Sequence, residues 1–221
     1  MFSSWNITFI FSKYGGFKLI AVIDYGMGNL ASVQNALLKL GYEVFISNDK
    51  ELIINADRVI LPGVGAFEDA IKCLCDLGLD QTIKQVLRYG KPVLGICLGM
   101  QLIFSQSEEN GLHTGLDLLP GRVVRFQLPP SYKVPHMGWN SIKPAQESRL
   151  FQGIDTGSYF YFVHSYYPVP EDSKVIAAQS EYGVNFTCAI EQDNLFATQF
   201  HPEKSGNIGL KVLKNFGEMQ L

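Results

Sequence analysis

Short apolar runs alternate with stretches of helical periodicity through the first half of the chain, and this alternation constrains the fold more than any other feature. The apolar runs are typical of buried strands, and the intervening stretches repeat apolar residues at the spacing of one helix face. Such alternation predicts an α/β fold with a mostly parallel central sheet and helices on both faces. The predicted strands are 19–24, 42–46, 58–61 and 92–96, and the predicted helices are 30–40, 67–77, 80–89 and 100–104.

The second half has a different pattern, with strand-like segments that follow one another without long helices between them. Gly, Asn, Asp and Pro separate these segments, which predicts antiparallel strands at one side of the sheet. A last helix is predicted at 208–216, and no linker or repeat divides the chain. We therefore expect residues 18–221 to form one domain. The strand-like segments are 123–126, 159–163, 174–179, 186–191 and 195–199.

Residues 1–17 do not fit this pattern. Their apolar run, Ile7–Phe11, precedes the only cationic side chain of the segment, Lys13. A secretory signal has basic residues before its apolar stretch, and a transit peptide is rich in Arg. We expect an extension outside the folded domain, whose deletion leaves folding and activity intact.

Composition excludes several classes of protein. The chain is 47% hydrophobic and 18% charged, so it can bury a large core and is not mainly disordered. Its net charge of −3 argues against nucleic-acid binding, which depends on clustered Lys and Arg. The longest nearly apolar run, 92–104, is shorter than the roughly twenty residues of a membrane span. Four cysteines are too few for a disulfide scaffold, which favours a cytoplasmic setting.

The segment Gly95-Ile-Cys-Leu-Gly99 places a cysteine between a predicted strand and a predicted helix. This is the pattern of a nucleophile elbow, in which flanking glycines let the backbone pack closely. The positive end of the following helix favours the thiolate form of Cys97. The alternative is that Cys97 is a small buried hydrophobic residue in a non-catalytic, flavodoxin-like binding module. Cys73 and Cys75 have no His or Cys cluster beside them, so we expect no metal or cofactor.

A cysteine nucleophile needs a base, and His201 is the best candidate. Glu203 lies two residues further on and would share its face of an extended backbone, where it could orient the imidazole. None of His113, His136 and His164 has a carboxylate at this spacing. The alternative for His201 is a surface His-Pro turn.

Acyl transfer also needs N–H donors for a developing oxyanion. The backbone N–H of Leu98 directly follows the proposed nucleophile, as the elbow geometry requires. The segment Pro62-Gly-Val-Gly65 ends a neighbouring predicted strand, where its glycines allow a peptide to turn inward. A phosphate-binding loop is the rival interpretation, but the Lys-Ser/Thr of such loops is missing here.

Taken together, Gly95–Gln101 and His201–Glu203 resemble the nucleophile and the His–Glu pair of class I glutamine amidotransferases. The resemblance extends from Leu19 to the C-terminus and implies their flavodoxin-like fold. Three further stretches are similar to the glutaminase subunits of imidazole glycerol phosphate synthase, in histidine biosynthesis: 24–30, 135–140 and 161–166. A glutaminase that serves anthranilate or guanylate synthesis is the alternative, and the stretches 24–30 and 135–140 argue against it.

The resemblance implies that Cys97 attacks the carboxamide of glutamine and forms a γ-glutamyl thioester. His201, held by Glu203, would transfer the protons, and the N–H groups of Val64 and Leu98 would bind the oxyanion. The implied glutamine-binding residues are Gly65, Gln101, Glu109, Ser165 and Tyr166.

The implied partner is a (β/α)₈-barrel cyclase, which would form a heterodimer with this chain and receive the ammonia. The cyclase would make imidazole glycerol phosphate and aminoimidazole-carboxamide ribotide from a phosphorylated precursor. This division of labour agrees with the lack of a basic patch in the chain. The residues implied near the interface are Asn29, His136, Trp139 and Lys204.

Overall fold

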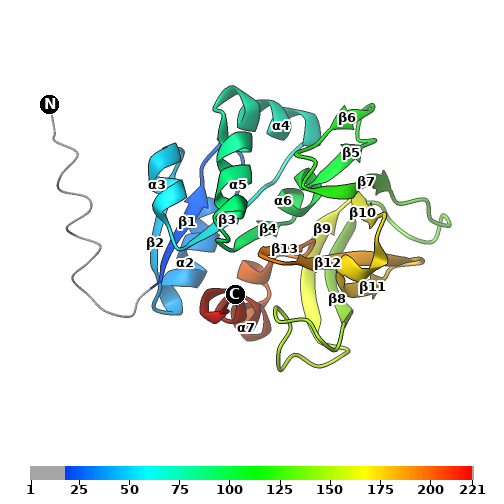
Figure 1. Cartoon of the computed structure of the whole chain (residues 1–221). Helices are drawn as coiled ribbons and strands as arrows, with labels where there is room; N and C mark the ends of the chain where they lie inside the picture. The colour runs from blue at the N-terminus through cyan, green and yellow to red at the C-terminus, as the bar shows by residue number, and fades with distance from the viewer. Residues whose placement is uncertain (1–17, 221) are drawn as a thin grey trace, which may run out of the picture.

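The computed structural model describes residues 18–220, whose arrangement is shown in Figure 1. The predicted extension at residues 1–17 lies outside the described residues. A nine-stranded sheet has the strand order β2-β1-β3-β4-β13-β12-β11-β8-β9, and a four-stranded sheet has the order β10-β7-β5-β6.

The first half of the chain, together with β13 from its C-terminal part, builds the parallel part of the larger sheet. Each neighbouring pair from β2 to β13 is parallel. Every residue of β3, β4 and β13 is buried, because helices cover both faces of the sheet here. These strands therefore consist mostly of apolar residues, as predicted, with Arg58 and Thr198 as the buried polar exceptions. Their bounds are β1 Leu19–Ile23, β2 Glu43–Ser47, β3 Arg58–Leu61, β4 Val93–Ile96 and β13 Leu195–Thr198.

Helices lie on both faces of this parallel part (Figure 1). Successive residues of a strand point to opposite faces. Ile20 and Val22 of β1 accordingly pack in the cluster that contains α2 and α7, whereas Ala21 and Ile23 pack with α3, α4 and α5. The prediction of helices on both faces is confirmed. The helices are α2 Leu30–Lys39, α3 Lys50–Asn55, α4 Phe67–Asp76, α5 Leu79–Arg88, α6 Leu98–Leu102 and α7 Gly206–Glu218.

The second half extends the same sheet with antiparallel strands, as predicted, but β13, predicted among them as 195–199, is also parallel to β4, and β8 was not predicted. Strand β13 pairs with β12, β12 with β11, β11 with β8, and β8 with β9, all in antiparallel register. The bounds are β8 His136–Pro144, β9 Tyr159–His164, β11 Ile176–Glu181 and β12 Asn185–Gln192. A short 3₁₀ turn, Ser173–Val175, occupies the start of the segment predicted as a strand at 174–179.

The smaller sheet was not predicted as a separate unit. It contains β5 Phe104–Ser107, β6 His113–Thr114, β7 Leu119–Arg125 and β10 Tyr166–Pro170. Only the end of β7 was predicted, as residues 123–126. The helix expected at 100–104 instead spans Leu98–Leu102, and β5 begins at Phe104.

Helix α3 was also missed, because six residues are too few to show a clear helical period. Its start is fixed by Asp49, whose carboxylate accepts hydrogen bonds from the backbone N–H groups of Glu51 and Leu52. Among residues 18–220, no helix has the length and apolar character needed to cross a membrane.

Candidate active site

Cys97 occupies the junction between β4 and α6, in a backbone conformation that L residues rarely adopt. Its φ is 56° and its ψ is −109°. The position is held by its neighbours: the N–H of Cys97 donates to the carbonyl of Thr198 at 2.7 Å, and its carbonyl accepts from the N–H of Met100 at 3.0 Å. A strained residue between a strand and a helix is the geometry of a nucleophile elbow.

The glycines on either side of Cys97 are required by close backbone contacts. A Cβ atom on Gly99 would lie 2.0 Å from the carbonyl oxygen of Leu61, at the end of β3. A Cβ atom on Gly95 would lie 2.7 Å from the carbonyl oxygen of Gly99. The sequence pattern around Cys97 therefore has a steric cause in this fold.

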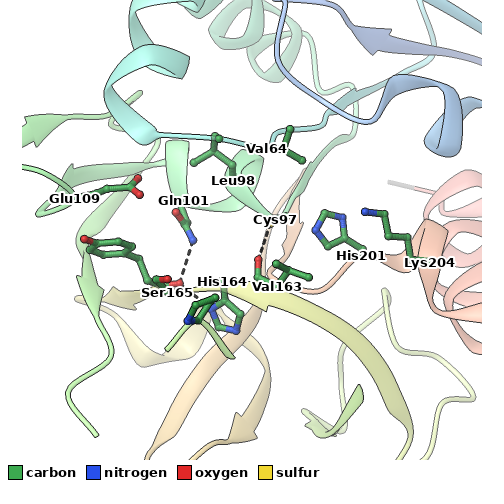
Figure 2. Close-up of a pocket in the computed structure, with 13 residues that line it drawn as sticks. Val64, Cys97, Leu98, Gln101, Glu109, Val163, His164, Ser165, His201 and Lys204 are labelled. Carbon is green, nitrogen blue, oxygen red and sulfur yellow. Dashed lines mark hydrogen bonds between the residues drawn. The ribbon is translucent and has the colours of Figure 1, made fainter. Parts of the chain in front are cut away.

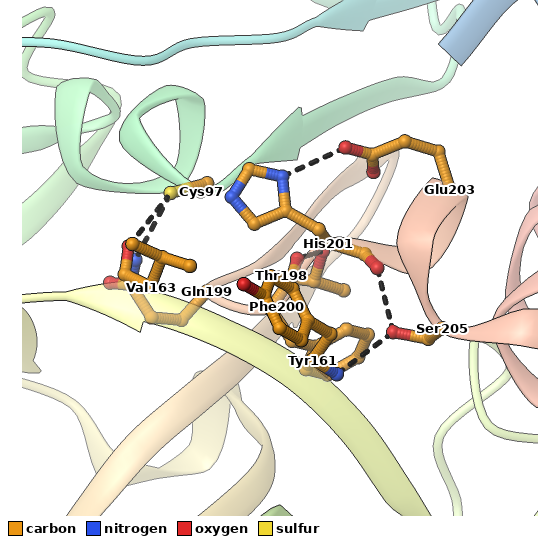
Figure 3. A network of polar contacts seen from close by, with 9 residues as sticks. All are labelled: Cys97, Tyr161, Val163, Thr198, Gln199, Phe200, His201, Glu203 and Ser205. Atoms are coloured by element: carbon orange, nitrogen blue, oxygen red, sulfur yellow. Dashed lines mark hydrogen bonds and ion pairs between the residues drawn. The ribbon is translucent and has the colours of Figure 1, made fainter. Parts of the chain in front are cut away.

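His201 follows the end of β13 and faces Cys97 on one side and Glu203 on the other (Figure 3). Its Nδ1 atom lies 2.8 Å from Oε1 of Glu203, which belongs to the short 3₁₀ turn Pro202–Lys204. Both side chains are buried, with exposed fractions of 5% and 1%. The hydroxyl of Ser205 donates to the carbonyl of His201 at 2.6 Å and accepts from the N–H of Tyr161 at 3.0 Å. These contacts fix the imidazole between a carboxylate and a thiol.

The electrostatics of this group favour a protonated His201. Burial by itself lowers the pKa of His201, but the adjacent Cys97 and Glu203 outweigh that effect and raise the pKa to about 10. An imidazole with this pKa can keep the proton that the sulfur of Cys97 releases. The arrangement is suited to a thiolate–imidazolium pair, the reactive form of a cysteine nucleophile.

A pocket of about 350 Å³ opens onto Cys97 and His201 (Figure 2). It brings together residues from the two halves of the chain, and most of the residues proposed from the sequence line it. These are Val64, Gly65, Cys97, Leu98, Gln101, Glu109, Ser165, Tyr166, His201 and Lys204. Pro135, Val163 and His164 complete the lining and were not proposed as site residues.

The other proposed residues lie outside this pocket. Glu203 contacts the far nitrogen of His201, and it lines a separate small hollow together with Asn29. Trp139 is 56% exposed on β8. His136, on the same strand, is only 3% exposed, so another protein could reach its strand but little of its side chain.

Glu109 joins the pocket to the start of α4. Its Oε2 atom accepts a hydrogen bond from the backbone N–H of Phe67 at 2.8 Å. Phe67 is the first residue of α4, and the side chain of the N-cap residue, Ala66, makes no capping bond. The carboxylate of Glu109 therefore caps this helix from across the pocket, beside Gly65.

The sequence interpretation missed Gln199, the first residue after β13. Its side chain is fully buried and contacts both Cys97 and Gln101. The amide nitrogen of Gln101 also donates to the carbonyl of Tyr166 at 3.1 Å. One signal could have found Gln199: it is a large polar side chain within the otherwise apolar run that leads to His201, and buried polar groups need partners.

The comparisons with known proteins agree with this geometry. A family model described as glutamine amidotransferase class I matches residues 21–219. The chain belongs to this family. The resemblance inferred from the motifs around Cys97 and His201 is confirmed, and this class I glutamine amidotransferase is accordingly an enzyme.

Curated relatives of this class I glutamine amidotransferase are named imidazole glycerol phosphate synthase subunit HisH. The one from Syntrophotalea carbinolica is 51% identical over 206 residues, which cover 91% of this chain and 100% of the relative. The one from Moorella thermoacetica is 56% identical over 200 residues, with 90% and 94% covered. The one from Methanothermobacter thermautotrophicus is 52% identical over 202 residues, with 91% and 98% covered.

Solved structures confirm the fold class. PurLQS from Thermotoga maritima matches with a TM-score of 0.71 at 20% identity and covers 91% of this chain and 98% of the matched chain. A chain described as glutamine amidotransferase matches with a TM-score of 0.66 at 19% identity, with 89% and 98% covered. At these identities the likeness concerns the fold, which is the predicted flavodoxin-like fold of class I glutamine amidotransferases.

Proposed function

We propose that the chain is the glutaminase subunit of an imidazole glycerol phosphate synthase, and that it passes ammonia to a cyclase subunit in histidine biosynthesis. The observation that carries the proposal is the placement of Cys97, His201 and Glu203 in one buried, contiguous group beside a pocket. The names of relatives about half identical to the chain support the choice of pathway.

In the proposed mechanism, the sulfur of Cys97 attacks the carboxamide carbon of glutamine. The backbone N–H groups of Val64 and Leu98 bind the oxyanion that develops on the carboxamide oxygen. His201 then gives its proton to the leaving ammonia, and a γ-glutamyl thioester remains on Cys97. Water hydrolyses this thioester with His201 as base, while Glu203 orients the imidazole throughout.

The proposed glutamine-binding residues are supported by the groups they present to the pocket. Gln101 uses its amide nitrogen in bonds to other residues, which leaves its Oε1 atom to accept from the α-ammonium of glutamine. The carboxylate of Glu109 adds negative charge for the same ammonium group. Gly65, Ser165 and Tyr166 complete this part of the lining and would contact the rest of the substrate.

The proposed cyclase would bind the face of the chain that carries the pocket mouth. Trp139, Met137 and Tyr159 are large apolar side chains that are more than half exposed on β8 and β9. Aromatic residues and Met are enriched at protein interfaces. We assign Asn29 and Lys204 to the same interface, and we place His136 beneath it.

A glutamine-analogue electrophile tests the proposed nucleophile. We expect a single adduct by intact-mass analysis and expect peptide mapping to place it on Cys97. The Cys97→Ala variant should remain unlabelled, and the Cys75→Ala control should be labelled like the unaltered chain. Absence of an adduct in the presence of the cyclase would exclude the enzymatic role of Cys97.

The division of labour is tested in the reconstituted complex. Cys97→Ala should abolish glutamine-dependent synthesis but leave ammonia-dependent synthesis largely intact, because only the source of ammonia is removed. Failure of added ammonia to restore synthesis would contradict the proposal. Copurification with a (β/α)₈-barrel cyclase would distinguish this role from a glutaminase of another pathway.

A further inference from the structure

Gln199 is buried directly behind the proposed nucleophile. Its side chain is 0% exposed, and its backbone N–H donates to the carbonyl of Cys188 at 2.8 Å. Both ends of its amide have partners: Oε1 lies 3.1 Å from Nε2 of Gln101, and Nε2 lies 3.8 Å from Sγ of Cys97. Figure 3 shows Gln199 reaching the sulfur from the side opposite His201.

The orientation of the Gln199 amide is set by its neighbours. The carbonyl of Tyr166 is an acceptor only, so the group that Gln101 directs at it must be the amide nitrogen, at 3.1 Å. The same nitrogen of Gln101 then donates to Gln199, whose oxygen must therefore face it. The NH₂ group of Gln199 is left to face the sulfur of Cys97.

Two groups contact the sulfur from this side, and they favour opposite protonation states. The carbonyl of Val163 lies 3.8 Å from Sγ and can only accept, so it interacts favourably with the neutral thiol. The amide nitrogen of Gln199 lies at the same distance and can only donate, so it interacts favourably with the thiolate. A hydrogen bond to the charged form of a group favours that form.

We propose that Gln199 is a positioning residue that stabilises the thiolate of Cys97 and fixes the orientation of Gln101 in the pocket. This inference rests on the proposed role of Cys97 as nucleophile. In this role Gln199 links substrate binding to nucleophilic attack. Its one buried amide contacts both the attacking sulfur of Cys97 and the side chain of Gln101, which is proposed to bind the substrate ammonium group.

The test measures alkylation of Cys97 by iodoacetamide from pH 5 to pH 10, on the full chain without glutamine or partner. The thiolate is the reacting form and displaces iodide, so the rate follows the thiolate fraction. Peptide mapping measures alkylation of Cys97 and of the exposed Cys75 in the same sample. The rate at Cys75 shows whether the reagent is equally active in every sample. Gln199→Met removes the donor at similar size. Gln179→Met is the matched control, at an exposed position on β11.

With Gln199→Met we expect alkylation of Cys97 at pH 7 to slow by about tenfold, with the half-maximal rate displaced upward by about one pH unit. Cys75 and the Gln179→Met control should be unchanged. Gln199→Leu also lacks a donor and adds no charge, so it provides the same test if Gln199→Met fails to fold. An unchanged pH profile in a folded variant would overturn the inference. If the half-maximal rate of Cys97 in the unaltered chain does not come at a lower pH than that of Cys75, the proposed nucleophile itself fails; comparing the pH of half-maximal rate removes the difference in exposure between the two thiols.

Discussion

The Nδ1 atom of His136 lies 2.9 Å from the Nε2 atom of His164, and the surrounding contacts set the tautomer of both rings. Nδ1 of His164 donates to the carbonyl of Tyr166 at 2.8 Å, so its Nε2 accepts from His136. The remaining nitrogen of His136 then accepts from the amide of Asn140 at 3.3 Å. This chain of bonds needs two neutral imidazoles, and it ends at the carbonyl that also receives the amide of Gln101.

The first prediction concerns acid stability. Burial lowers the pKa of His136 to about 4 and that of His164 to about 3. Between pH 6.5 and pH 4 the unfolded chain therefore binds protons that the folded chain does not, and stability falls with falling pH. Each histidine should cost about 1.4 kcal/mol per pH unit in this window.

Urea unfolding from pH 4.5 to pH 7 measures this slope. The neutral substitution His164→Gln should make it shallower, whereas the control Gln179→Met, at an exposed position without a titratable group, should leave it unchanged. Equal slopes for His164→Gln and the unaltered chain would show that the pair is not held neutral.

The second prediction concerns the pair His201 and Glu203. The pKa of His201 is raised to about 10 in the folded chain, against the opposing effect of burial. Its contribution to stability is therefore fully present below pH 6.5 and is lost as the pH rises toward 10. Glu203→Gln should reduce this loss, and it should lower glutaminase kcat by roughly 100-fold or more because the base is no longer oriented.

Unfolding free energies at pH 6 and pH 9.5, together with the rate of ammonia release, check this prediction. Glu218→Gln is the control, since Glu218 is an exposed carboxylate 3.8 Å from Lys214. If Glu203→Gln releases ammonia as fast as the unaltered chain, the carboxylate of Glu203 has a purely structural role.

The nucleophile elbow and the parallel sheet could be predicted from the sequence because each has a local cause. Gly95 and Gly99 are needed for close backbone contacts, and the apolar runs of β3 and β4 reflect burial on both faces. The close packing of Cys97 and His201 follows from β4 and β13 being parallel neighbours. The adjacency of β4 and β13 depends on the order of all the strands in the sheet. No local pattern predicts that order, so the pairing of Cys97 with His201 was expected from the family resemblance.

The features that could not be predicted from the sequence depend on contacts between distant parts of the chain. The resemblance places His136 near an interface, but no local pattern indicates that Phe162 and Tyr182 stack on its ring, with centroids at 5.0 and 4.1 Å, and bury it. Gln199 looks like the end of a strand until its contacts with Cys97 and Gln101 are seen. Nothing within the short segments of β5 and β6 indicates which strands they pair with.

The third prediction is a steric one. Gly99→Ala would place a methyl group 2.0 Å from the carbonyl oxygen of Leu61, where only backbone movement can make room. We expect a loss of about 3 kcal/mol or more of stability. Gly41→Ala is the control: it has a φ of 87° but no atom within 4 Å of the added Cβ, so strain alone should cost about 1–2 kcal/mol. Equal melting temperatures for the two variants would contradict the steric account.

The fourth prediction separates the two roles of Glu109, helix cap and proposed ligand of the substrate ammonium group. Glu109→Ala removes the acceptor for the N–H of Phe67 and should lower stability by about 1 kcal/mol. Glu109→Gln keeps an acceptor oxygen but loses the charge, so it should restore most of the stability while KM for glutamine remains raised by about tenfold.

The matched control for Glu109 is its neighbour Glu108, whose carboxylate accepts from the backbone N–H of Arg125 at 2.6 Å and does not line the pocket. Glu108→Ala also loses a bond to a backbone N–H, so it should lower stability without changing KM. Thermal melting and glutamine-dependent ammonia release measure the two effects. A KM equal to that of the unaltered enzyme in Glu109→Gln would restrict Glu109 to capping α4, because Gln has the same size and an acceptor oxygen but lacks the negative charge.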